Sequence, residues 1–251
     1  FLEKAKEQSF LSQYEIPDKY QLMWRFRTNS MFDLANYYSN SPVLLDEHFR
    51  SAYPIIQFSN KEFYGNRIRI MTKDAGTDDV LELHHVVEGK VDSDCTRNMP
   101  EVEAVIKRIH ELIAEDDGND ENPVSIGIIS PFRGQVDLIQ KALCQVLTET
   151  TIRKHQIEVG TAHTFQGDER DVMILSFAVA DNSFVQSLTF LQKPNLFNVA
   201  ITRARKKLIC FISRNPKTLP QGLLRDYIEY IQQYLDAAKD DEFRKNTYKN
   251  E

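Results

Sequence analysis

The chain has 251 residues, of which 41% are hydrophobic and 27% are charged, and its formal net charge at pH 7 is −6. This composition is typical of a globular chain that is long enough to bury a substantial core. It excludes a general polycation for nucleic acid while leaving room for a local basic groove. No run of about 18 apolar residues is present, so we expect no membrane span and no membrane partner.

The cysteines indicate a reducing compartment. Cys95, Cys144 and Cys210 are scattered and form no CxxC pair, so we predict neither a disulfide framework nor a metal site. The expected location is the cytoplasm, or the nucleus in a eukaryote. The chain starts FLEKAKEQSF, without an initiator Met or a signal-peptide pattern, and we expect it to be a piece of a longer protein.

The first half of the chain alternates helical and strand patterns after a weakly patterned start. Residues 1–40 are expected to be a connector or a helical segment from a preceding domain. The segment that follows, PVLLDEHF, begins with an apolar run that predicts a short strand, and the chain after Ser51 has a helical pattern. Alternating apolar residues then predict half-exposed strands in NRIRIM and LHHVVEG.

The second half has a more regular alternation. Helical spacing is seen over 102–113, 136–147 and 224–235, and apolar runs predict buried strands in VSIGIIS, IEVGTAH, VMILSFAV and LICFIS. Continuous apolar strands that alternate with helices indicate an α/β fold with a parallel sheet covered on both faces. The charged tail 236–251 is expected to fray.

Polar residues follow several of these strands, where ligands of such sheets bind. SPFR follows VSIGII, Arg50 follows PVLLDEHF, and GTAHTFQGDE follows the strand that begins at Ile157. We therefore expect hydroxyls, an imidazole, an amide, a carboxylate and arginines to gather at one edge of the sheet.

Four segments in order resemble motifs of superfamily 1 helicases. ISPFRGQ, VGTAHTFQGDERDVMILS and NVAITRAR are similar to motifs IV, V and VI, most closely to those of the 5′-to-3′ (1B) branch, and LLDEHFRSAYPIIQFSNKEFY resembles the segment that opens the second RecA-like domain. The resemblance covers roughly residues 41–213. It implies a RecA-like P-loop NTPase fold for residues 41–235.

In that family ATP lies between two RecA-like domains, and the first domain carries the phosphate loop and the Mg²⁺ ligands. The resemblance implies that Arg50 and Arg203 are arginine fingers, a role that suits the permanently charged guanidinium fork. Phe49 matches an aromatic residue that stacks on adenine, and Glu169 matches the carboxylate that accepts from the ribose hydroxyls. Gly167 lets the backbone approach the nucleotide, and Gln166 is expected to link the nucleotide to the strand.

The other matched residues imply contacts with a single strand of nucleic acid. Thr161 and His163 begin motif V, and Ser130, Pro131 and Phe132 belong to motif IV. Hydroxyl and imidazole groups bind phosphate oxygens without reading sequence, and an aromatic ring stacks on a base.

Some of these residues also have ordinary structural interpretations. His163 alone is more often a hydrogen-bonded residue at a strand end, and Arg50 can pair with Asp46 or Glu47. The cations of RARKK fit a solvated helix end. That interpretation is kept for Lys206 and Lys207, rejected for Arg203 and left open for Arg205.

The sequence departs from a complete motor. No GxxxxGK[ST] phosphate loop occurs, and NLF precedes NVA where the family often has basic residues. We therefore expect the second motor domain of an ATP-dependent DNA or RNA helicase, which works with an N-terminal RecA-like domain, ATP and Mg²⁺. The alternative is a non-catalytic adaptor derived from a helicase.

Overall fold

The structure is a computed structural model that describes residues 4–26, 28–39, 43–72, 79–94, 96–119 and 121–248. The chain divides into two compact units, residues 1–45 and residues 46–251. The first unit is helical and contains α1 (Lys4–Gln13), α2 (Asp18–Gln21) and α3 (Met31–Tyr38). A capping box between Ser30 and Asp33 starts α3.

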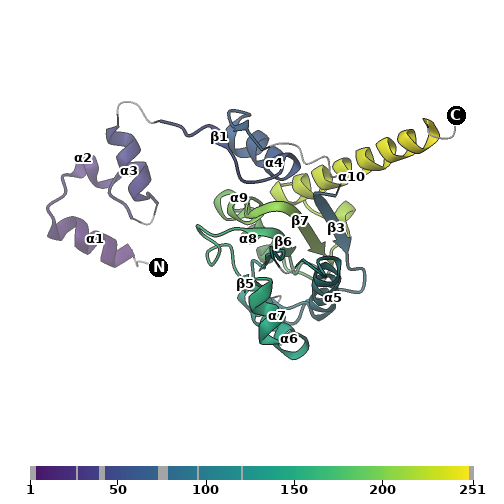
Figure 1. The fold of residues 1–251 in the computed structure, drawn as a ribbon. Coiled ribbons are helices and arrows are strands. Elements are labelled where there is room, and N and C mark those ends of the chain that lie inside the picture. Colours follow the sequence, from purple (N-terminus) through teal and green to yellow (C-terminus); the bar gives the residue numbers. More distant parts are fainter. Residues whose placement is uncertain are drawn as a thin grey trace. The chain divides into compact units, whose positions relative to one another are not determined.

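The second unit is built on a five-stranded sheet with the strand order β3-β7-β6-β4-β5, in which every pairing is parallel (Figure 1). A separate two-stranded parallel sheet pairs β1 with β2. The bounds of the strands are β1 (Glu47–His48), β2 (Arg69–Ile70), β3 (Leu81–His85), β4 (Ile126–Ile129), β5 (Glu158–Gly160), β6 (Arg170–Ser176) and β7 (Ala204–Ile212).

The helices of this unit are α4 (Tyr53–Tyr64), α5 (Met99–Glu115), α6 (Arg133–Val146), α7 (Glu149–Lys154), α8 (Val185–Leu191), α9 (Pro194–Ile201), η1 (Pro216–Thr218) and α10 (Leu223–Tyr248). They cover both faces of the five-stranded sheet because neighbouring residues of each strand point to opposite faces. In β6, Ile174 packs with α5 and α6, whereas Leu175 packs with α4, α8, α9 and α10. The predicted α/β architecture with a parallel sheet between helices is therefore confirmed.

The expectations for the run before β1 and for the C-terminal tail are wrong. The apolar run before β1 is not a strand: Val43 and Leu45 are 87% and 88% exposed, and only Glu47–His48 pair with β2. The charged tail does not fray at residue 236, because α10 continues to Tyr248.

Candidate functional site at the two edges of the sheet

The predicted site residues lie at two opposite edges of the sheet. Gly160 pairs with Ile129 at the carboxyl ends of β5 and β4, whereas Arg170 begins β6 and pairs with Ala204 at the start of β7. Because all these strands are parallel, segment 161–169 crosses from the carboxyl edge to the amino edge. The expectation that one edge gathers all the polar groups is therefore wrong.

The crossover segment 161–169 is anchored by one buried ring. Phe165 is 0% exposed and packs in the core, and the Arg170 guanidinium lies 5.9 Å from the centre of its ring. Where the segment begins, the Thr161 N–H donates to Thr164 Oγ1 over 3.2 Å. Near its other end, Gly167 has a φ of 92°, and no heavy atom lies within 4 Å of the point where a Cβ would stand. Its backbone is therefore open to a ligand, and its conformation favours glycine.

At the amino edge, one carboxylate lies between two arginines. The Arg50 Nε pairs with Glu169 Oε2, and the Arg205 Nη1 lies 3.7 Å from Glu169 Oε1. The alternative pairing of Arg50 with Asp46 or Glu47 is not found, since both of those carboxylates pair with Arg69.

Arg203 lies beside Arg50 with no carboxylate of its own. Its Nε donates to the Val199 carbonyl over 3.2 Å, and its Nη1 donates to the Asp168 carbonyl over 3.4 Å. Within the part of the chain that the structure describes, no carboxylate oxygen lies within 4 Å of this guanidinium. Burial and then the positive charge of Arg50 lower the pKa of Arg203, and the nearby carboxylates of Glu169 and Asp168 oppose part of this lowering.

Arg205, near the start of β7, forms ion pairs at this edge of the sheet. Its Nη2 lies 3.2 Å from Asp171 Oδ1, which also pairs with Lys206 over 3.1 Å. Burial opposes ionisation of Asp171, but hydrogen bonds from Ser125 and Lys206 hold its pKa below the ordinary value. Lys206 and Lys207 do not lie at a helix end as expected, because both belong to β7.

Next to Arg50, the sequence interpretation missed His48. The His48 Nε2 lies 2.8 Å from the Ser51 N–H and accepts from it. Burial and then the charge of Arg50 lower the pKa of His48, which favours this neutral acceptor form. Phe49, between the two, is 67% exposed. Its ring is therefore free to stack on a planar ligand.

At the carboxyl edge, the residues differ in their access to a ligand. His163 is exposed and Thr161 is half-buried. Ser130 is 0% exposed and its Oγ accepts from the Phe132 N–H over 3.5 Å, which gives Ser130 a role in shaping the loop before α6. Arg133 is exposed at the start of α6, and no carboxylate in the described ranges lies within 4 Å of it. The sequence placed Arg133 at this edge without giving it a role.

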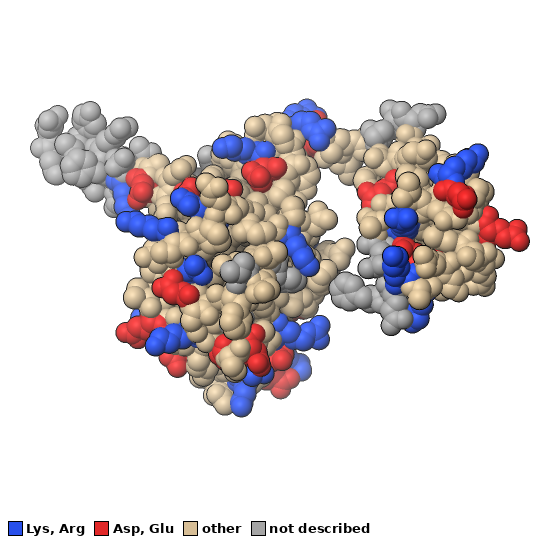
Figure 2. Space-filling model, turned by 180° about the vertical axis from the view of Figure 1, so that it is seen from behind, with Lys and Arg blue, Asp and Glu red and all other residues tan. Residues whose placement is uncertain are grey.

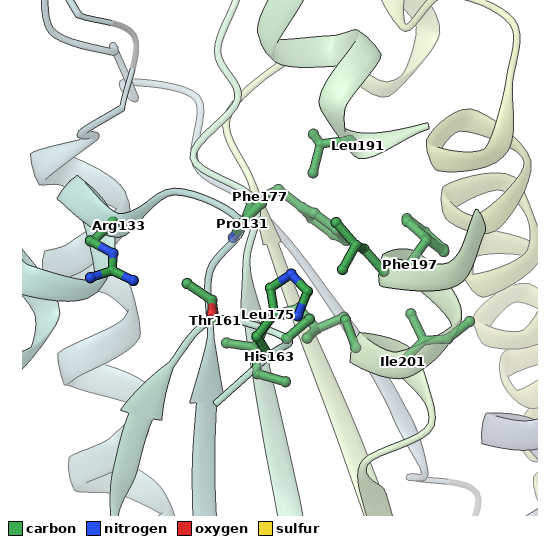
Figure 3. Close-up of a pocket in the computed structure, with 13 residues that line it drawn as sticks. Pro131, Arg133, Thr161, His163, Leu175, Phe177, Leu191, Phe197 and Ile201 are labelled. Atoms are coloured by element: carbon green, nitrogen blue, oxygen red, sulfur yellow. The ribbon is translucent and has the colours of Figure 1, made fainter. Parts of the chain in front are cut away.

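A cavity of about 220 Å³ lies at the same edge, between the ends of β4, β5 and β6 and the helices α8 and α9. In Figure 3, Arg133 and Thr161 lie to the left and the His163 ring lies in the middle, with Phe197 and Ile201 to the right and Leu191 above. The cavity was not predicted, because two of its walls are helices that the sequence pattern did not reveal.

Charges of both signs are spread over the surface. Figure 2 shows Lys and Arg side chains interspersed with Asp and Glu on one face, and the chain has 31 Lys and Arg residues against 37 Asp and Glu residues. Among residues 4–26, 28–39, 43–72, 79–94, 96–119 and 121–248, no three His, Cys, Asp or Glu side chains are placed to hold a metal ion. None of the helices described there is long and apolar enough to cross a membrane.

The family model described as an AAA domain matches residues 27–215. Helicase SEN1 of Saccharomyces cerevisiae is 27% identical over 81% of this chain, and an uncharacterized ATP-dependent helicase, MG140, of Mycoplasma genitalium is 25% identical over 88%. A homolog of regulator of nonsense transcripts 1 from Arabidopsis thaliana is 37% identical over 43% of the chain. The matched regions are 10%, 21% and 9% of these three proteins.

Among solved structures, the C-terminal domain of a possible DNA helicase from a Lactobacillus aligns with 66% of this chain and 87% of that chain, at 19% identity and a TM-score of 0.39. The order and register of the chain's own strands define its fold. The family match covers most of the chain, and the relatives it resembles over the same region are named helicases. The chain therefore belongs to the AAA domain family, as a second RecA-like domain of the superfamily 1 helicase type.

Proposed function

We propose that this chain is the C-terminal motor domain of an ATP-dependent helicase that acts on DNA or RNA. The observation that supports this best is the amino edge of the sheet, where Arg50 and Arg203 lie close together and the Glu169 carboxylate attracts both of them. Two neighbouring guanidinium groups repel each other, so a polyanion such as a triphosphate relieves the repulsion.

Arg50 and Arg203 act on the γ-phosphate of an ATP bound mainly by an N-terminal RecA-like domain, which also supplies the Mg²⁺ ligands. Among the residues that the structure describes, carbonyl oxygens alone bind the Arg203 guanidinium, so Arg203 is free to reach a phosphate. Arg50 must exchange its pairing with Glu169 for the phosphate. That exchange leaves Glu169 to accept from the ribose, while exposed Phe49 stacks on adenine and Gly167 gives access to the nucleotide.

The carboxyl edge binds a single strand. Thr161 and His163 contact phosphate oxygens, and Pro131 and Phe132 lie beside the strand. Segment 161–169 joins this edge to the nucleotide edge directly, and Gln166 is exposed within it. A shift of the segment on ATP turnover is then transmitted from one ligand to the other. The 5′-to-3′ direction of movement stays a prediction.

The test is the ATP turnover of the intact protein with and without single strands, for wild type, Arg50→Ala and Arg69→Ala. Arg69 is a matched control because it is an exposed arginine on the neighbouring strand and pairs with Asp46 and Glu47. We expect Arg50→Ala to lose most of the turnover and Arg69→Ala to keep it. A wild-type protein that binds single strands but turns over no ATP is instead an adaptor.

A further inference from the structure

The cavity at the carboxyl edge is lined almost entirely by apolar side chains. Its walls include Leu175 and Phe177 from the end of β6 and the loop after it, and Leu196, Phe197 and Ala200 from α9. Leu196 and Ala200 are half-buried, so the cavity reaches the surface along α9. Phe177 and Phe197 are stacked, with an interplanar angle of 11°. Such a wall favours a flat, apolar ligand.

The size of the cavity limits what it accepts. Its volume of about 220 Å³ exceeds the roughly 150 Å³ of an apolar protein cavity that binds benzene. It is smaller than the roughly 300–1,000 Å³ that is usual for sites of drug-sized ligands and cofactors. One planar ring system therefore fits, and a complete cofactor does not.

The mouth of the cavity carries groups that bind anions. Arg133 lies there with no carboxylate partner in the described part of the chain, and it begins α6, a helix whose start no side chain caps. Helix N-termini attract phosphate. The Thr161 hydroxyl and the His163 imidazole also line the cavity (Figure 3). Anion-binding groups beside a small apolar cavity match the phosphate and the base of one nucleotide.

We propose that the cavity receives one unstacked nucleobase of the bound single strand, while the adjoining phosphate lies on Arg133 and the start of α6. This inference rests on the proposed function, because it requires that the carboxyl edge binds a strand. The walls offer few polar atoms to read the edge of a base, so the cavity accepts any base and adds affinity without adding sequence preference.

The experiment fills the cavity with a larger side chain and, separately, removes one base from the single strand. In the intact protein, Ala200→Trp places an indole in the cavity, and Ala114→Trp is the matched control because Ala114 is exposed in the last turn of α5. Strand affinity is measured with complete single strands that just fill the binding site, so that the protein cannot shift along them, and with strands of the same length that carry one abasic site, moved along position by position. Melting curves check folding, and Leu196→Trp replaces Ala200→Trp if the latter does not fold.

We expect one abasic position to weaken wild-type binding by about 5- to 150-fold, the range that corresponds to stacking of one base. Ala200→Trp should weaken binding of the complete strand to a similar extent, and the abasic site should then cause no further loss. Ala114→Trp should behave as wild type. Equal wild-type affinity for complete and abasic strands, or losses that multiply in Ala200→Trp, would overturn the nucleobase pocket alone. A wild-type protein that binds no single strand would overturn the proposed function as well.

Discussion

Replacing Arg203 separates a role in phosphoryl transfer from a role in folding. If Arg203 acts on the γ-phosphate, its charge matters most when negative charge spreads over the transferring oxygens. Arg203→Ala in the intact protein should then lower kcat by about 10²–10⁴, which corresponds to about 3–5 kcal/mol of transition-state stabilisation. Nucleotide affinity should change much less, because the phosphate loop and Mg²⁺ hold ATP in the ground state.

The cost to folding can be bounded from the contacts. Arg203 donates to two carbonyl oxygens, of Val199 and Asp168, over 3.2 and 3.4 Å. Two such bonds contribute about 1–2 kcal/mol to the free energy of unfolding, and relief of the repulsion with Arg50 offsets part of the loss. We therefore expect the melting temperature to fall by about 2–6 °C, which does not account for a large loss of turnover.

The assay combines steady-state ATP turnover, nucleotide binding and thermal melting for wild type, Arg203→Ala and Arg203→Lys. The ammonium of Lys cannot reproduce the guanidinium fork, so Arg203→Lys should recover little activity. Arg225→Ala is the control, because Arg225 forms a surface pair with Glu229 on α10, and surface pairs contribute little to stability. A kcat of Arg203→Ala close to that of wild type, with normal melting, would show that Arg203 does not act on the γ-phosphate.

Three further results are expected. Burial raises the pKa of Glu101 from 4.5 to about 7, so the free energy of unfolding should fall by about 3 kcal/mol as pH rises from about 4.5 to 7. Denaturant titrations of Glu101→Gln should show no such fall. A fall of the same size in that variant would show that Glu101 is not the titrating group. Gly167→Ala should lower the free energy of unfolding by about 1–2 kcal/mol, because a φ of 92° strains any residue with a Cβ, although no atom crowds the position of that Cβ. The same titrations measure this change, and an unchanged midpoint would show that the turn adapts to alanine. The purified 251-residue chain should hydrolyse no ATP measurably, since it has no phosphate loop; strand-stimulated turnover by this chain would contradict the shared site.

The sheet was predictable because its signal is local. Runs such as VMILSFAV are apolar at nearly every position, as strands covered on both faces must be, and Ile174 and Leu175 indeed pack on opposite faces. The run at Val43–Leu45 is equally apolar, yet it is exposed before β1. An apolar pattern alone therefore does not show which apolar segments become strands of the sheet.

The division of the site between two edges was not predictable, because it depends on the edge of the sheet at which the next strand begins. Thr161 and Glu169 are close in sequence, but the parallel pairing of β6 with β4 carries Glu169 to the opposite edge. The partner of Arg205 is likewise set by strand pairing, which brings Asp171 of β6 beside β7. The cavity depends on α8 and α9, which are too short for a clear helical period in the sequence.

In the proposed division of the site, the amino edge of the sheet binds ATP and the carboxyl edge binds the single strand. The most direct test measures strand affinity and ATP turnover, with and without strand, for Arg203→Ala and for the double variant Thr161→Ala with His163→Ala in the intact protein. Arg203→Ala should lose turnover under both conditions and keep its strand affinity. The double variant should keep its strand-free turnover and bind all sequences of single strand more weakly to a similar degree. Loss of strand affinity in Arg203→Ala, or loss of strand-free turnover in the double variant, would contradict the division of the site.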